Sequence, residues 1–98
     1  YQKRELDKNT IAIDPKKTSF PLRLRKRKEG DVFSPIGMMG KKKVSKYFKD
    51  EKLSKIEKDN TWILCTKEDK IIWIIGLRAD KNECEYSAKE NLIFISKL

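Results

Sequence analysis

The chain has 98 residues and a net charge of +9, with 24 lysines and arginines against 15 aspartates and glutamates. A chain of this length buries only about 60–65% of its unfolded surface, which allows one modest core. We therefore expect a single domain over residues 1–98. Because the sequence opens on Tyr1 in a polar run, we also expect a fragment of a larger protein. The positive charge favours RNA or anionic lipid as partners.

Several classes of function are disfavoured by what the sequence lacks. It contains no histidine, so the usual general base near neutral pH is missing. Cys65 and Cys84 form no C-x-x-C pair, which disfavours zinc. We expect the Cys65 thiol to be buried. A disulfide between Cys65 and Cys84 is the alternative that the sequence leaves unresolved. No run approaches the roughly 20 apolar residues of a membrane span, and no charged start followed by an apolar run suggests a signal peptide. We predict a cytoplasmic domain with no catalytic residue, metal, cofactor or membrane partner.

The first quarter of the chain predicts two strands. Residues 10–13 favour β structure, and Asp14-Pro15 should end that strand because the residue before proline is disfavoured in a helix. Residues 20–25 then alternate between apolar and basic side chains. A period of two places Phe20, Leu22 and Leu24 on a core face, and Arg23 and Arg25 on a basic face.

Residues 27–43 predict a structured loop, because glycines and Pro35 interrupt any apolar periodicity. The apolar side chains within this segment can pack against the body of the domain and order the loop. Residues 44–56 then carry apolar groups at helical spacing with lysines between them. Ser54 and Glu57 match a capping box, which predicts a break and a second helical turn starting near Ser54.

The remaining elements are strands. Residues 62–66 and 71–75 are apolar, and the polar residues 67–70 between them predict a hairpin with Trp73 in the core. Residues 92–95 predict one more strand near the C-terminus. Strands around one short helical segment indicate an α+β domain.

The cations gather in two segments, on the second strand with its exit and after the glycines of the loop. We expect the loop to bring them together as a contact for a phosphate backbone: Arg23, Arg25, Arg27, Lys28, Lys41, Lys42, Lys43 and Lys46. The alternative is that these charges merely keep the surface solvated. Attachment of the lysine-rich helix to an anionic membrane is disfavoured, because that helix also carries Asp50, Glu51 and Glu57.

Read as a unit, residues 25–50 resemble the C-terminal domain of bacterial tRNA(Ile)-lysidine synthetases. They are similar to the family pattern R-x-R-x-x-G-D-x-F-x-P-x-G-M, which a lysine-rich stretch and a short helix follow. Residues 71–78, Ile-Ile-Trp-Ile-Ile-Gly-Leu-Arg, are similar to the family's I-I-W-V-x-G-x-R strand. The resemblance covers about residues 20–80. Glu29 departs from it, since many members have proline there.

The resemblance implies a small β-sandwich-like α+β domain of the kind shared with a domain of phenylalanyl-tRNA synthetase. It also implies a cytoplasmic bacterial enzyme that uses ATP and lysine to convert the wobble cytidine of a minor isoleucine tRNA to lysidine. The catalytic N-terminal domain of the same polypeptide would perform that reaction, and this chain would grip tRNA(Ile) around its acceptor stem. The alternative is a structural domain that packs on its parent enzyme.

Within this resemblance we assign loop-shaping roles to Gly30, Asp31, Phe33, Pro35, Gly37, Met38 and Gly40. Gly30-Asp31 should turn the chain, with the carboxylate binding nearby backbone N–H groups. Phe33, Pro35 and Met38 should anchor the loop to the core. Two roles stay open for Arg78, which is expected either to reach RNA or to pair with Asp80.

Overall fold

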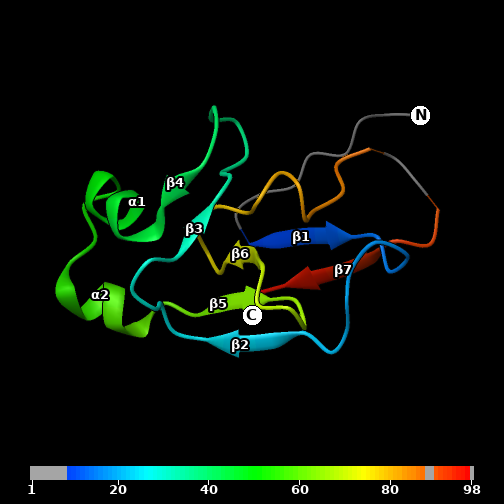
Figure 1. Ribbon diagram of the computed structural model, residues 1–98, viewed down its shortest axis with the longest axis horizontal. Coiled ribbons are helices and arrows are strands. Elements are labelled where there is room, and N and C mark those ends of the chain that lie inside the picture. Colours follow the sequence, from blue (N-terminus) through cyan, green and yellow to red (C-terminus); the bar gives the residue numbers. More distant parts are fainter. Residues whose placement is uncertain (1–8, 88–89, 98) are drawn as a thin grey trace.

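The computed structural model describes residues 9–87 and 90–97. Its elements are β1 (Thr10–Ile13), β2 (Arg23–Arg25), β3 (Val32–Phe33), β4 (Lys42–Lys43), α1 (Val44–Asp50), α2 (Lys55–Asn60), β5 (Ile63–Cys65), β6 (Ile71–Ile74) and β7 (Ile93–Ser96). All strand pairs are antiparallel, in sheets β1-β7, β2-β5-β6 and β3-β4. The helices lie at one end of the molecule and the β1-β7 ribbon at the other (Figure 1). The predicted α+β class and the predicted hairpin are confirmed.

The β5-β6 hairpin is the centre of the fold because both of its faces are buried. One face packs Ile63, Cys65, Ile71 and Ile74 against β3 and α1. The other packs Leu64, Ile72 and Trp73 against β1. Leu64 pairs with Trp73 and Cys65 with Ile71, which leaves Ile72 as an extra residue in a bulge. The bulge lets neighbouring Ile72 and Trp73 enter the same cluster.

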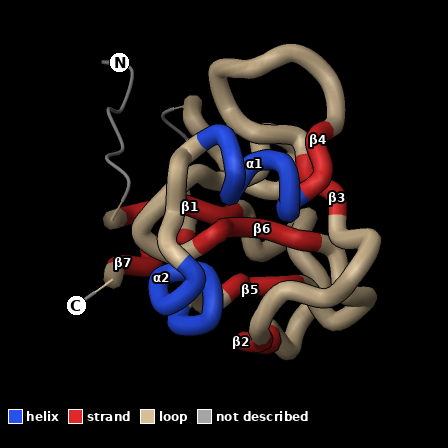
Figure 2. Tube along the Cα trace, turned by 90° about the vertical axis from the view of Figure 1, so that its left-hand side faces the viewer, coloured by secondary structure: helices blue, strands red, loops and turns tan. Residues whose placement is uncertain are grey.

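Two short helices replace one continuous helix, as the capping box predicted. α1 packs above β6 in Figure 2 and buries Val44, Tyr47 and Phe48. α2 begins after Ser54, whose hydroxyl accepts a hydrogen bond from the Glu57 amide at 3.1 Å. The Glu57 carboxylate accepts one from the Ser54 amide at 2.8 Å. α2 buries no residue, and Ile56 is exposed on it.

The predicted faces of the strand in residues 20–25 are confirmed only in part: Leu22 packs against a core cluster and Arg23 is exposed, but Phe20, Leu24 and Arg25 differ from the prediction. Leu24 is 59% exposed, and Phe20 is 44% exposed. The side chain of Arg25 points inward and keeps only 15% of its surface exposed. The carboxylates of Asp31 and Asp69 lie beside the Arg25 guanidinium and form ion pairs with it. Their ion pairs hold the guanidinium inside.

Asp80 fastens the loop that follows β3. Its carboxylate accepts hydrogen bonds from the amides of Ser34 at 2.7 Å, Asn82 at 2.7 Å and Glu83 at 3.1 Å. Two backbone hydrogen bonds join the same segments: the Lys81 amide donates to the Ser34 carbonyl, and the Ile36 amide donates to the Ala79 carbonyl. We call these contacts, together with those of the Asp80 carboxylate, the Asp80 seam. These bonds hold the loop before the second basic segment in place. Of the two roles left open for Arg78, the pairing with Asp80 is absent among the described residues, where Arg78 donates to the Ile36 carbonyl at 2.8 Å instead.

Cys65 and Cys84 are both buried and free, so no disulfide joins them. Within residues 9–87 and 90–97, no helix is long and apolar enough to cross a membrane. No group of three potential metal ligands occurs in that part of the chain.

Replacing Asp80 with Asn should lower the free energy of unfolding by about 2–3 kcal/mol, because an amide cannot accept all three backbone N–H groups and leaves a buried donor unpaired. Urea denaturation measures this cost. Asp59→Asn, on the exposed face of α2, is the matched control and should change stability by less than about 0.5 kcal/mol. Equal stability of the two variants would contradict the role of Asp80.

Candidate nucleic-acid interface

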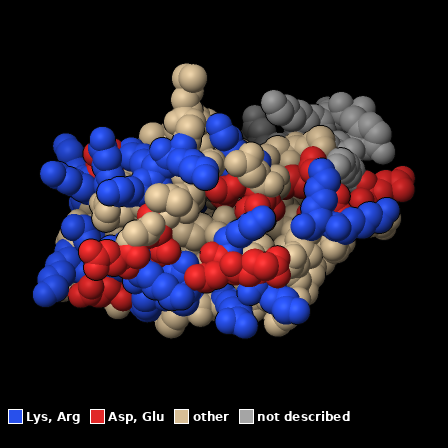
Figure 3. All heavy atoms as spheres, in the orientation of Figure 1, with Lys and Arg blue, Asp and Glu red and all other residues tan. Residues whose placement is uncertain are grey.

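The structure joins the two basic segments at one place. β3 and β4 pair Val32 with Lys43, which sets the second segment beside the loop that leaves the first. Arg27 and Lys43 line one open depression, whose other lining residues include the acidic Glu29 and Asp31. The expected juxtaposition is therefore present for these two cations. Lysine and arginine atoms gather at the upper left of Figure 3, where α1 and β4 lie, whereas acidic atoms form a band across the lower middle.

Six of the eight predicted contact cations are exposed: Arg23, Arg27, Lys28, Lys41, Lys43 and Lys46. α1 strengthens this surface because its first turn contains no acidic residue. Lys43 lies at its N-cap, and Lys46 and Lys49 are exposed along it. Side chains of this kind can reach successive phosphates.

Arg25 belongs to the interior of the domain rather than to this surface. Its guanidinium donates to both carboxylate oxygens of Asp31, at 2.8 and 3.0 Å, and to Asp69 at 2.8 Å. The hydrogen bond to Asp31 is the main reason that the pKa of Arg25 is raised. Burial alone would raise the pKa of Asp31, but the hydrogen bonds from Arg25 and the Lys28 amide lower it. Arg25 is a cross-link, because Asp31, Asp69 and the Lys26 carbonyl accept from four of its five N–H donors.

Lys42 is also held by the protein. Its ammonium forms an ion pair with Asp50 and lies 5.8 Å from the centre of the Tyr47 ring, and its side chain is 17% exposed. Lys28 forms a looser pair with Asp69 at 3.3 Å, with 61% of its side chain exposed. Lys28 thus remains accessible, whereas Lys42 and Arg25 shape the surface.

The loop-shaping expectations are met in most positions. Gly30 has a φ of 86°, and the Asp31 carboxylate accepts the Lys28 amide at 2.8 Å, which forms the predicted turn. Phe33 is buried, with its ring edge-to-face on Tyr47 at 5.2 Å between centroids. Pro35 is fully buried. Met38 is 36% exposed, so its expected anchoring is wrong.

Met39 is 98% exposed at the tip of this loop. Gly37 and Gly40 flank the two methionines with φ angles of 78° and 68°, which are strained for other residues. This tight turn points the tip away from the core.

Replacing Asp31 with Asn should lower the free energy of unfolding by about 2–3 kcal/mol at neutral pH, since Arg25 loses a charged partner inside the fold. The pKa of Asp31 is lower in the folded state than in the unfolded one. Its contribution is therefore present above about pH 4 and is lost as the pH falls through the folded pKa. Denaturation from pH 7 to pH 3 measures the difference.

Asp69→Asn serves as the comparison for that series. Its carboxylate is 44% exposed, so solvent screens the pair with Arg25 and the loss should be smaller. Asn also tolerates the positive φ of 69° at this position. A difference between wild type and Asp31→Asn that does not shrink below pH 4 would show that the ion pair is not its cause.

Comparison with known proteins agrees with this geometry. The family model described as TilS substrate C-terminal domain matches residues 22–94. The tRNA(Ile)-lysidine synthase of Parabacteroides distasonis is 48% identical over 90 residues, covering 91% of this chain and 20% of that protein. The enzyme of Bacteroides thetaiotaomicron is 43% identical over 74 residues, covering 76% of this chain and 17% of that protein. The chain thus spans about a fifth of the length of these relatives.

A solved structure supports the same relationship across the fold. The crystal structure of a TilS C-terminal domain matches with a TM-score of 0.84 and 27% identity, covering 98% of this chain and 74% of that chain. The similarity extends beyond residues 20–80, to residue 94 in the family model. The chain therefore belongs to the family of TilS substrate C-terminal domains, the C-terminal domains of tRNA(Ile)-lysidine synthases.

Proposed function

We propose that this chain is the tRNA-binding domain of a bacterial tRNA(Ile)-lysidine synthase. It grips tRNA(Ile) around the acceptor stem while the catalytic N-terminal domain of the same polypeptide modifies the wobble cytidine with ATP and lysine in the cytoplasm. The names of the relatives support the parent activity. The observation that carries the binding role is the gathering of exposed cations on the β2-β3 connection, β4 and α1.

The chemistry of this surface suits a phosphate backbone rather than a base sequence. Arg27 offers a planar fork for phosphate oxygens, and the exposed lysines act as mobile point charges. Such contacts position a nucleic acid without reading it. The Arg25–Asp31 cross-link and the Asp80 seam hold the loop below these side chains. The loop therefore loses little conformational entropy when RNA binds.

A second candidate function, docking of the domain on its parent enzyme, is favoured by a different surface. Leu24 is 59% exposed and Trp62 is 47% exposed, on β2 and just before β5. The Lys26 ammonium lies 4.2 Å from the centre of the Trp62 ring. Apolar side chains of this size are typical of interface anchors. Because these residues differ from the basic ones, separate variants test the two functions.

Charge reversal at Lys43 and Lys46 should weaken binding of a bacterial tRNA(Ile) by at least about tenfold at low salt. It should also lower the slope of log affinity against log salt by about 1.5–2, the loss expected for two phosphate contacts. Fluorescence anisotropy across a salt series measures both quantities. Lys42 is left intact because its pair with Asp50 stabilises the fold.

Lys16→Glu with Lys67→Glu is the matched control, since both residues are exposed and the net charge changes by the same amount. Its affinity should fall only modestly and its salt slope should stay near the wild-type value. Equal losses in the two double variants would mean that overall charge, rather than this surface, attracts the RNA. Absence of wild-type binding at any salt would favour the docking function.

A further inference from the structure

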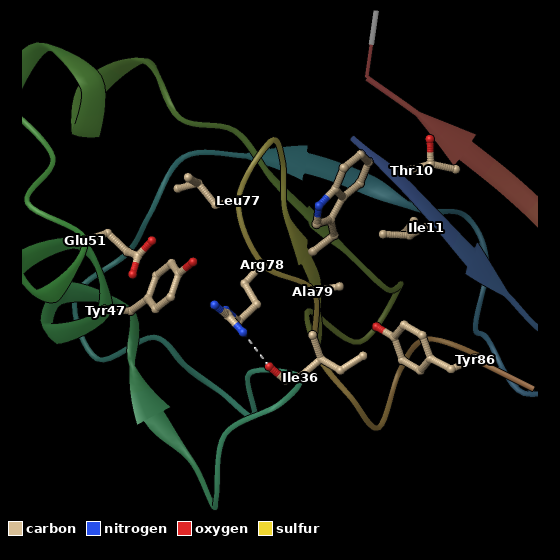
Figure 4. Close-up of a pocket in the computed structure, with 10 residues that line it drawn as sticks. Thr10, Ile11, Ile36, Tyr47, Glu51, Leu77, Arg78, Ala79 and Tyr86 are labelled. Carbon is tan, nitrogen blue, oxygen red and sulfur yellow. Dashed lines mark hydrogen bonds between the residues drawn. The ribbon is translucent and has the colours of Figure 1, made fainter. Parts of the chain in front are cut away.

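A separate concavity of about 280 Å³ lies beside the basic surface. It opens between α1, the loop that begins at Ile36, the start of β1 and the turn after β6. Figure 4 shows its walls, which include Tyr47 of α1, Glu51 at the C-cap of that helix, Arg78 and Tyr86. The volume falls just below the roughly 300–1,000 Å³ of pockets for drug-sized ligands. A single planar ring system is of suitable size.

Tyr86 supplies an unused hydrogen-bonding group to this cavity. Its hydroxyl is buried and forms no hydrogen bond of normal geometry among the described residues, and its neighbour is the weakly hydrogen-bonding thiol of Cys84. Burial raises the pKa of Tyr86, so the hydroxyl stays protonated and able to donate. Its oxygen points toward the cavity in Figure 4. Buried polar groups are normally paired, so an orphan on a cavity wall indicates a missing partner.

Arg78 and Glu51 add complementary groups. One N–H of Arg78 donates to the Ile36 carbonyl at 2.8 Å, and the guanidinium also interacts with the Tyr47 hydroxyl. These contacts hold the guanidinium in place, and its five N–H donors leave some for a ligand. Glu51 brings a carboxylate acceptor. A carboxylate repels phosphate but accepts hydrogen bonds from amino groups and sugar hydroxyls. Donors and an acceptor around apolar walls therefore fit a nucleobase with its ribose.

The cavity and the basic surface share α1. Lys43 is the N-cap of this helix and Lys46 lies in its first turn, whereas Tyr47 of the cavity is at its middle and Glu51 is its C-cap. Seven helical residues span only about 10 Å. A strand whose phosphates contact the lysines can therefore place a neighbouring nucleotide at the mouth of the cavity.

We propose that this cavity binds one unpaired nucleotide of the bound RNA, with its base held by Arg78 and Tyr86. The proposal rests on the proposed function for the path of the RNA, but it has separate observable consequences. Proteins commonly recognise splayed-out bases in RNA by such pockets, because paired bases hide their edges.

The first test compares a blunt RNA hairpin with the same hairpin carrying one unpaired terminal nucleotide. The added nucleotide should tighten binding to the wild type by about tenfold. Tyr86→Phe should reduce this gain to about threefold or less and leave blunt-hairpin binding unchanged. Ser19→Ala, which removes a hydroxyl outside the cavity, is the control and should keep the full gain.

Stability separates this binding role from a structural one. Because the Tyr86 hydroxyl forms no hydrogen bond of normal geometry among the described residues, Tyr86→Phe should unfold at the same temperature as the wild type or higher. A lower unfolding temperature would mean that the hydroxyl serves the fold and would overturn the proposal.

The second test uses AMP, CMP, GMP and UMP and follows NMR signals of the protein. At least one nucleotide should shift signals of Arg78 and Tyr86 at concentrations up to about 10 mM, a weak-binding range. If blunt hairpins fail to bind but these signals shift, the proposed function fails and the cavity proposal stands. If an unpaired nucleotide adds no affinity, or the monophosphates shift only lysine signals, the cavity proposal is overturned.

Discussion

The fold depends on burying both faces of the β5-β6 hairpin. Strands buried on one face could rest on a single partner layer, but this hairpin needs α1 and β3 on one side and β1 on the other. The bulge at Ile72 makes this possible, since it turns two adjacent large side chains to the same face. The basic elements β4 and α1 are therefore fixed because the core cannot close without Val44, Tyr47 and Phe48.

The Arg25–Asp31 pair then decides which cations are free to bind. It joins β2 to the turn before β3, and Asp69 ties the β5-β6 loop to the same guanidinium. A bidentate buried pair satisfies its donors within the protein, so Arg25 offers little to a phosphate. The cations on either side of it, Arg23 and Arg27, stay exposed. A sequence that looks uniformly basic thus contains both structural cross-links and available contacts.

Sequence patterns predicted correctly the elements that depend on interactions between residues close together in the chain. The hairpin, the capping box at Ser54 and the turn at Gly30-Asp31 depend on neighbours within a few residues, and all are present. The inward side of β2 depends on Asp31 and on Asp69, which is far away in the sequence, and the prediction was wrong there. The Asp80 seam links segments about 46 residues apart. The same holds for the cavity at Tyr86, whose walls come from five separate segments of the chain.

The central claim is that RNA contacts one defined set of lysines. Lysine acylation followed by mass spectrometry, with and without a bacterial tRNA(Ile), tests this claim most directly. The account predicts that tRNA protects Lys28, Lys41, Lys43 and Lys46, while Lys16 and Lys67 react equally in both states. Lys42 should react slowly in both because of its pair with Asp50. Uniform protection of all lysines, or protection only at Lys16 and Lys67, would contradict the account.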